Sequence, residues 1–156
     1  MENNGKSDTK KIIIGVLCFL IVVVFALIIV IKIAKPKKDP LQIKLETYAG
    51  YYYEYYCSLY KNDKGEIDNE KRTETLSKYT EIGIKVDLEN LVRTLAGNKD
   101  IETKENLKDK TTEELLDEFT KKGKKCDSKK TKVTLYPSAP YTSKDVRIEA
   151  HLECDN

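Results

Sequence analysis

The chain has 156 residues, which gives room for one modest domain and excludes a two-domain enzyme. Its formal net charge of +2 is unevenly distributed, because residues 1–38 carry +5 (seven Lys against Glu2 and Asp8) and the remaining residues carry −3. The basic residues flank an apolar stretch, and the rest of the chain lacks the positive excess with which proteins bind a nucleic-acid backbone, so we predict no nucleic-acid partner.

The apolar stretch covers residues 12–31, twenty consecutive residues without a charge. At 1.5 Å of rise per residue, a helix of this length spans about 30 Å, the thickness of the hydrocarbon core of a bilayer. We therefore expect a short N-terminal tail (1–11) and a transmembrane helix (12–34) that contacts the lipid bilayer through residues 12–31. No ionisable side chain interrupts the span, so we interpret it as an anchor and not as part of a transport path.

A linker rich in Pro and Lys (35–40) separates this span from a soluble domain predicted at residues 41–156. Its first element is a helix at residues 41–60, for which Asp39 is a good N-cap and Pro40 suits the first turn. Apolar residues recur at alternating spacings of four and three, which predicts an amphipathic helix with one apolar seam: Leu41, Leu45, Tyr48, Tyr52, Tyr55 and Leu59.

Tyrosines are concentrated on this helix, since seven of the ten lie within residues 48–60. They occupy every side of it, so one group can pack against the domain and the excess predicts an interaction surface for a protein partner or a second copy of the chain. The alternative is a helix enclosed wholly by its own domain. The residues predicted to form the surface are Tyr48, Tyr51, Tyr52, Tyr55, Tyr56 and Leu59.

The middle of the chain predicts short elements. Residues 66–81 are mostly polar and predict a loop with one short helical turn, whereas residues 83–86 alternate weakly, as a short strand does. A helix is expected at residues 88–96, with Asp87 as its N-cap and Gly97 as its left-handed stop.

A further helix is predicted after Thr111, which forms a capping-box pair with Glu114. Gly123 offers a residue that would end it. Its predicted buried stripe is Leu115, Leu116 and Phe119. The acidic residues of the same segment are interpreted as a solvated face: Glu113, Glu114, Asp117 and Glu118.

The C-terminal part changes to a period of two. Val133 and Leu135 alternate with polar residues, two prolines interrupt the chain at residues 137–140, and apolar residues then alternate with charged ones over residues 146–154. This pattern predicts two antiparallel neighbouring strands with one apolar and one charged face. The fold class is therefore α+β: an N-terminal transmembrane helix, a long amphipathic helix, short helices and a small antiparallel sheet.

Three cysteines lie outside the apolar stretch, without the C-x-x-C spacing of a zinc site. His151 and Cys154 are three residues apart on a strand and so point to opposite faces, which excludes a shared metal ion. Cys154 lies on the apolar face of the last strand and Cys126 in the turn before the preceding one, so we predict a disulfide between them. The alternative is two reduced thiols. Cys57 would be buried among aromatic neighbours or would cross-link two copies.

Catalytic templates find no match in the chain, which has one His, no Trp, no Gly-rich phosphate loop and no set of residues arranged as a Ser/His/Asp triad. We therefore predict that the protein is not an enzyme. For the same reason we predict no cofactor and no metal site.

The order of an apolar N-terminal helix, an amphipathic helical extension, a middle loop and terminal antiparallel strands with late cysteines resembles type IV pilin-like proteins and pseudopilins. In motif, the likeness lies in the tail, where residues 125–127 (Lys-Cys-Asp), 132–135 (Lys-Val-Thr-Leu) and 149–154 (Glu-Ala-His-Leu-Glu-Cys) look like the cysteine-bounded sheet that ends many such proteins of low-GC Gram-positive bacteria. The resemblance implies a component of a surface or secretion assembly.

Membrane orientation depends on two opposing signals. Three Lys precede the span and four follow it, which slightly favours a cytoplasmic domain, whereas a disulfide favours the outside. We expect a single-pass protein of the cell membrane whose C-terminal domain is extracytoplasmic and acts in binding or assembly. The alternative is a cytoplasm-facing, membrane-tethered regulatory or scaffold protein with reduced thiols.

Overall fold

The structure of the chain is a computed structural model, and the residues that it describes are 20–21, 23–24, 38–101 and 107–154. They belong to two compact units, Met1–Lys37 and Lys38–Asn156. In the first unit the described residues are helical, with exposed apolar side chains: Leu20, Ile21, Val23 and Val24. The predicted tail and most of the predicted transmembrane span lie outside the described residues.

Within the described residues, no helix is both long enough and apolar enough to cross a bilayer. The predicted anchor therefore stays a prediction from the sequence.

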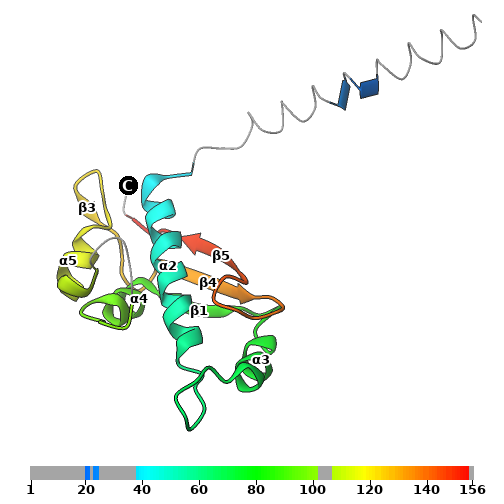
Figure 1. Ribbon diagram of the computed structural model, residues 1–156. Coiled ribbons are helices and arrows are strands. Elements are labelled where there is room, and N and C mark those ends of the chain that lie inside the picture. Colours follow the sequence, from blue (N-terminus) through cyan, green and yellow to red (C-terminus); the bar gives the residue numbers. More distant parts are fainter. Residues whose placement is uncertain (1–19, 22, 25–37, 102–106, 155–156) are drawn as a thin grey trace, which may run out of the picture. The chain divides into compact units, whose positions relative to one another are not determined.

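The second unit is an α+β structure, as the sequence predicts. Its three-stranded antiparallel sheet has the order β1-β4-β5, with β1 at Ile84–Asp87, β4 at Lys132–Pro137 and β5 at Val146–His151. Helix α2 (Pro40–Ser58) lies across one face of this sheet and contacts β4 and β5 (Figure 1). The opposite face carries exposed charged side chains: Lys85, Lys132, Arg147, Glu149 and His151.

Helix α2 begins where the sequence predicts. The carboxylate of Asp39 accepts a hydrogen bond from the backbone N–H of Leu41 (3.0 Å), and Pro40 occupies the first turn, where its missing N–H has no consequence. The helix ends at Ser58, two residues before the predicted end.

The buried side of α2 differs from the predicted seam in its C-terminal half. Tyr52 and Tyr55 are only half-buried and Leu59 is 55% exposed. Four of the five fully buried residues follow a spacing of four, and Tyr48 lies beside this row. Such a row is inclined to the helix axis, because α2 crosses the sheet at an angle and its contact row drifts around the helix. The five are Leu45, Tyr48, Ala49, Tyr53 and Cys57.

The polar segment predicted as a loop with one short helical turn contains a nine-residue helix, α3 (Asn69–Ser77), so its helical part is longer than predicted. The Asp68 carboxylate accepts from the N–H of Lys71 (2.9 Å) and caps the helix. Leu76 is its single buried residue. A helix is indicated in a sequence by a hydrophobic stripe. The segment has no such stripe, because α3 is capped locally and buries one side chain.

Two further helices confirm their capping signals. Helix α4 (Leu88–Leu95) starts at Asp87, whose carboxylate accepts from the N–H of Asn90 (2.8 Å). Helix α5 (Thr112–Asp117) follows the 3-10 turn Leu107–Asp109 and has the predicted capping box. The residues of its predicted stripe lie as follows: Leu115 and Phe119 are fully buried and Leu116 is half-buried.

Gly123 does not end α5, which stops at Asp117. Instead, Lys122 (φ 50°) and Gly123 (φ 81°) form the two-residue loop of a hairpin between β2 (Thr120–Lys121) and β3 (Lys124–Lys125). Positive φ at both loop residues gives the turn the twist that a tight antiparallel hairpin needs.

The C-terminal strands confirm the predicted antiparallel pair, with Leu135 opposite Ile148. Regular pairing in β5 ends at His151, so the last strand is shorter than predicted. The predicted disulfide is also present, between Cys126 and Cys154, with a Cα–Cα distance of 4.0 Å.

Candidate functional site

The predicted interaction residues of α2 fall into three environments. Tyr48 is fully buried within its own domain and cannot meet a partner. Tyr51, Tyr52, Tyr55 and Tyr56 are half-buried, and Leu59 is exposed at the end of the helix. The surface available for binding is therefore limited to the outward side of the C-terminal half of α2.

Tyr48 has a structural role. Its ring contacts Phe119 edge to face at 5.7 Å, and its hydroxyl donates a hydrogen bond of 2.5 Å to the carboxylate of Glu118. Lys44 (3.1 Å) and Lys110 also donate to this carboxylate. Burial works to raise the pKa of Glu118, but the hydrogen bonds from Lys110, Tyr48 and Lys44 outweigh it and hold the pKa below its ordinary value.

Tyr52, Tyr56 and Tyr60, each four residues from the next, form an aromatic strip that begins on the C-terminal half of α2. The rings of Tyr52 and Tyr56 are stacked at 6.2 Å, and Tyr60 contacts Tyr56 edge to face at 5.7 Å. Burial, with smaller effects of Tyr56 and Tyr55, raises the pKa of Tyr52, and burial also raises the pKa of Tyr60. The phenols of Tyr52 and Tyr60 are therefore neutral at physiological pH, and the strip offers apolar ring faces.

Two open depressions adjoin the C-terminal half of α2. They enclose about 210 Å³ and 460 Å³ and share Tyr55, Ser58 and Asp100 among the described residues that line them. The first also includes Tyr51, and the second includes Leu59, Lys61 and Lys99. Of these residue types, the aromatic ones are enriched in protein interfaces, whereas charged residues are found mainly at the rim. We call the surface formed by Tyr51, Tyr55, Ser58, Leu59 and Asp100 the α2 surface.

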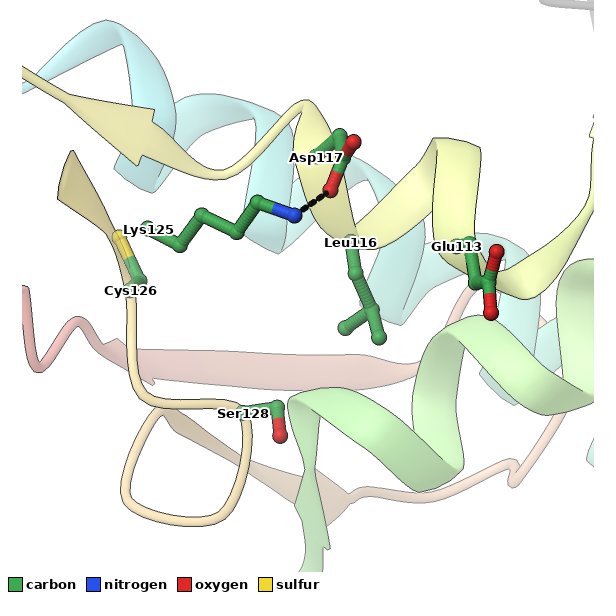
Figure 2. Close-up of a pocket in the computed structure, with 6 residues that line it drawn as sticks. All are labelled: Glu113, Leu116, Asp117, Lys125, Cys126 and Ser128. Atoms are coloured by element: carbon green, nitrogen blue, oxygen red, sulfur yellow. Dashed lines mark ion pairs between the residues drawn. The ribbon is translucent and has the colours of Figure 1, made fainter. Parts of the chain in front are cut away.

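A third depression, of about 330 Å³, lies beside the disulfide. Figure 2 shows Lys125 reaching from β3 toward Asp117 of α5, with which it forms an ion pair of 2.5 Å. Leu116, Glu113 and Ser128 complete its wall. The sulfur of Cys126 is bonded to Cys154, so the depression offers no free thiol.

Three of the four acidic residues of the α5 segment have individual structural partners, although the sequence suggested only a solvated face. Glu114 closes the capping box, and hydrogen bonds from the backbone and the side chain of Thr111 lower its pKa. Asp117 pairs with Lys125 and Glu118 with two lysines. Among the described residues, no three His, Cys, Asp or Glu side chains lie close enough to hold a metal ion.

His151, the only histidine, is exposed, and its Nε2 lies 3.3 Å from the carboxylate of Glu153. It is on the charged face of β5, whereas Cys154 is bonded to Cys126. The two side chains predicted to point apart are therefore not brought together.

Cys57 is 2% exposed, which favours the buried alternative over a cross-link between copies. Burial raises the pKa of its thiol. It lies beside the hydroxyl of Tyr53, which has no other hydrogen-bond partner in the described part of the chain, and near Arg72, whose Nε is likewise buried without one.

Sequence patterns missed the role of Glu118 because its partners Tyr48 and Lys44 lie 70 and 74 residues earlier and only tertiary packing joins them. The sequence does contain an indication of the β2–β3 hairpin, Gly123 in its two-residue loop. The lysines on both sides of this glycine made the segment resemble a solvated turn. Comparison of this chain with protein-family models, with curated proteins and with solved structures finds no match.

Proposed function

We propose that this chain is a single-pass protein of the cell membrane. Its second unit (Lys38–Asn156), the soluble unit, lies on the extracytoplasmic side and binds a protein partner or a second copy of the chain. The apolar stretch at residues 12–31 supports the anchor. The observation that carries the outward orientation is the disulfide between Cys126 and Cys154.

The disulfide supports this side of the membrane because glutathione and thioredoxin keep cytosolic thiols reduced. Its geometry is set by the fold, since the N–H of Asp127 donates to the carbonyl of Glu153 (2.8 Å) directly beside it. A bond that closes a 28-residue loop stabilises a small domain substantially in an oxidising compartment.

The α2 surface supports binding as the activity. Tyr55 and Leu59 present apolar area next to the charges of Lys61, Lys99 and Asp100, an apolar centre with a polar rim. The pilin-like resemblance adds the more specific proposal that the partner belongs to a surface or secretion assembly, in which helices of neighbouring subunits contact each other.

The orientation is tested in intact cells with a membrane-impermeant maleimide, added before and after a reductant. The proposal expects labelling only after reduction, because Cys57 is buried and the other two soluble-unit cysteines are bonded. A variant with Cys126→Ser and Cys154→Ser is the control, and neither treatment should label it. Labelling that appears only after lysis would instead support the cytoplasm-facing alternative.

Anchoring and binding are tested separately. Alkaline carbonate should leave the protein in the membrane pellet, and its release would contradict the anchor. For binding, a photo-crosslinking amino acid replaces Leu59 and, as a control, Ile82, which is 65% exposed outside the α2 surface. Cross-links from position 59 alone support the α2 surface, whereas equal yields or none from position 59 contradict it.

A further inference from the structure

The β2–β3 hairpin concentrates positive charge at one place on the soluble unit. Its six residues, 120–125, include four lysines, and the tight loop at Lys122 and Gly123 brings those of both strands together. Lys122, Lys124 and Lys125 are exposed, and the side chain of Lys121 is 42% exposed.

Ion pairs hold this hairpin beside the first turn of α2. The Nζ of Lys121 lies 2.6 Å from the carboxylate of Asp39, the N-cap of that helix, and Lys125 pairs with Asp117 at the hairpin's base. Figure 1 shows the hairpin at the end of the soluble unit where α2 begins. Lys38 and Lys44, also at this end, form ion pairs with Glu46 and Glu118.

The charge of the hairpin is opposite in sign to the net charge of the rest of the unit. Residues 39–156 carry a net charge of −3, from 21 Lys and Arg against 24 Asp and Glu. Since the hairpin contributes +4, the remaining residues of this range carry −7, and two of these acids, Asp39 and Asp117, pair with Lys121 and Lys125. A negatively charged surface would therefore attract the hairpin and repel the bulk of the unit, which favours one orientation.

The distance along the chain allows such a contact. Only seven residues separate Asp39 from Ile31, the last residue of the apolar stretch, and the eight steps of an extended chain between them reach at most about 28 Å. The end of the soluble unit that carries the hairpin is thus confined near the bilayer if residues 12–31 span it.

We propose that the lysines of the β2–β3 hairpin bind the headgroups of anionic phospholipids in the same bilayer that anchors the chain. The inference rests on the membrane anchoring proposed above. Lysines beside a membrane-attached segment gain binding energy from the negative surface potential, and several together orient the domain that carries them. The contact holds the Asp39 end of α2 at the membrane and turns its Ser58 end, about 28 Å away for a helix of 19 residues, toward the solution. The α2 surface is then accessible to a partner.

The test uses the full chain reconstituted in two kinds of vesicle, of phosphatidylcholine alone and with about 30% phosphatidylglycerol, the source of the surface potential. A membrane-impermeant N-hydroxysuccinimide ester acetylates accessible lysines, and mass spectrometry gives the rate at each position. Lys61 and Lys64, exposed in the turn after α2, are the internal control.

We expect acetylation of Lys122 and Lys124 to be about fivefold slower in the anionic vesicles, with the rates at Lys61 and Lys64 little changed. About 0.5 M salt should abolish the difference, because it shortens the Debye length to a few ångströms. In neutral vesicles, the rates at the four positions should be alike.

Two outcomes would overturn the inference. One is an equal rate at Lys122 and Lys124 in both kinds of vesicle, which would mean a hairpin surrounded by water. The other is equal slowing at Lys61 and Lys64, which would mean general attraction without orientation. Both are read only from protein that resists carbonate extraction from the vesicles. Failure of that extraction control would contradict the anchor instead, so the two failures are distinguishable.

Discussion

The hydroxyl of Tyr48 donates a 2.5 Å hydrogen bond to the carboxylate of Glu118, a residue seventy positions later in the chain. The same carboxylate accepts hydrogen bonds from Lys44 and Lys110, and its side chain is only 20% exposed. One acidic residue therefore joins α2 to the segment around α5, and Phe119 packs against Tyr48 directly beneath it.

Replacement of Glu118 by Gln should destabilise the soluble unit by about 1–2 kcal/mol, since hydrogen bonds to charged groups contribute more than neutral ones but these are partly exposed. The melting temperature should fall by about 4–8 °C, as thermal unfolding followed by circular dichroism would show. Glu113→Gln, on the exposed side of α5, is the matched control and should change stability by less than about 0.5 kcal/mol. Equal effects of the two variants would contradict the role of Glu118.

The decrease of the unfolding free energy at acidic pH depends on several carboxylates. Lys121 and the N–H of Leu41 lower the pKa of Asp39, as hydrogen bonds lower that of Glu118, so protons bind these groups more weakly in the folded state. Their contribution to stability is present above the unfolded pKa, near 4, and is lost as the pH falls through the folded values. Urea unfolding should give a flat profile from about pH 6 to 8 and a decline below about pH 4.5. The decline should be shallower in Glu118→Gln, and an unchanged slope in that variant would exclude Glu118 as a contributor.

Two tyrosines on the same helix allow a matched comparison of the buried hydroxyl group. Tyr48 and Tyr53 are both fully buried, but the Tyr48 hydroxyl binds Glu118, whereas that of Tyr53 has only the thiol of Cys57, a weak partner, nearby. Tyr48→Phe should cost about 1–2 kcal/mol because it removes a charge-assisted hydrogen bond. Tyr53→Phe should change the unfolding free energy by less than about 0.5 kcal/mol, or raise it. A larger loss for Tyr53→Phe would show that its hydroxyl has a partner.

The sequence predicted most elements whose signals are local. Asp39, Asp87 and Thr111 each cap the helix predicted to follow, and the period of two in residues 133–136 and 146–151 identifies the paired strands. The disulfide was also predictable, because both cysteines flank those strands. These features depend on residues a few positions apart, or on one strand pair.

Features that depend on how elements cross could not be predicted. The heptad pattern predicted Tyr52, Tyr55 and Leu59 in the buried seam, but the crossing of α2 over the sheet buries Tyr53 and Cys57 instead. For the interaction surface, the sequence predicted the helix, whereas tertiary packing determined which of its tyrosines remain accessible.

Removal of the disulfide should be costly. The bond closes a loop of 28 residues, for which the chain-entropy estimate gives about 3–4 kcal/mol. Addition of a reductant should lower the melting temperature of the wild-type protein and leave that of the Cys126→Ala, Cys154→Ala variant unchanged. If the reductant has the same effect on both, Cys57 or a non-specific cause is responsible.

Gly83 and Gly65 test whether a close contact adds to the cost of a left-handed backbone. Both have positive φ, +70° and +79°, so Ala at either position adopts a conformation that costs about 1–2 kcal/mol, partly offset by a less flexible unfolded chain. At Gly65 no atom lies within 4 Å of an added Cβ, whereas at Gly83 it would lie 2.3 Å from Cγ2 of Thr134 and 3.0 Å from the ring of Tyr136. Thr134 is β-branched, so its methyl group cannot move aside easily.

Gly65→Ala should therefore lower the unfolding free energy by about 1 kcal/mol or less, and Gly83→Ala by about 2–4 kcal/mol, measured by urea denaturation. A second substitution identifies the cause. Thr134→Ser removes the clashing methyl group and keeps the hydroxyl, so in the Gly83→Ala background it should recover part of the loss, although by itself it destabilises or is neutral. If the two substitutions are additive, the methyl contact does not contribute, and the cost of Gly83→Ala comes from the backbone and the ring of Tyr136.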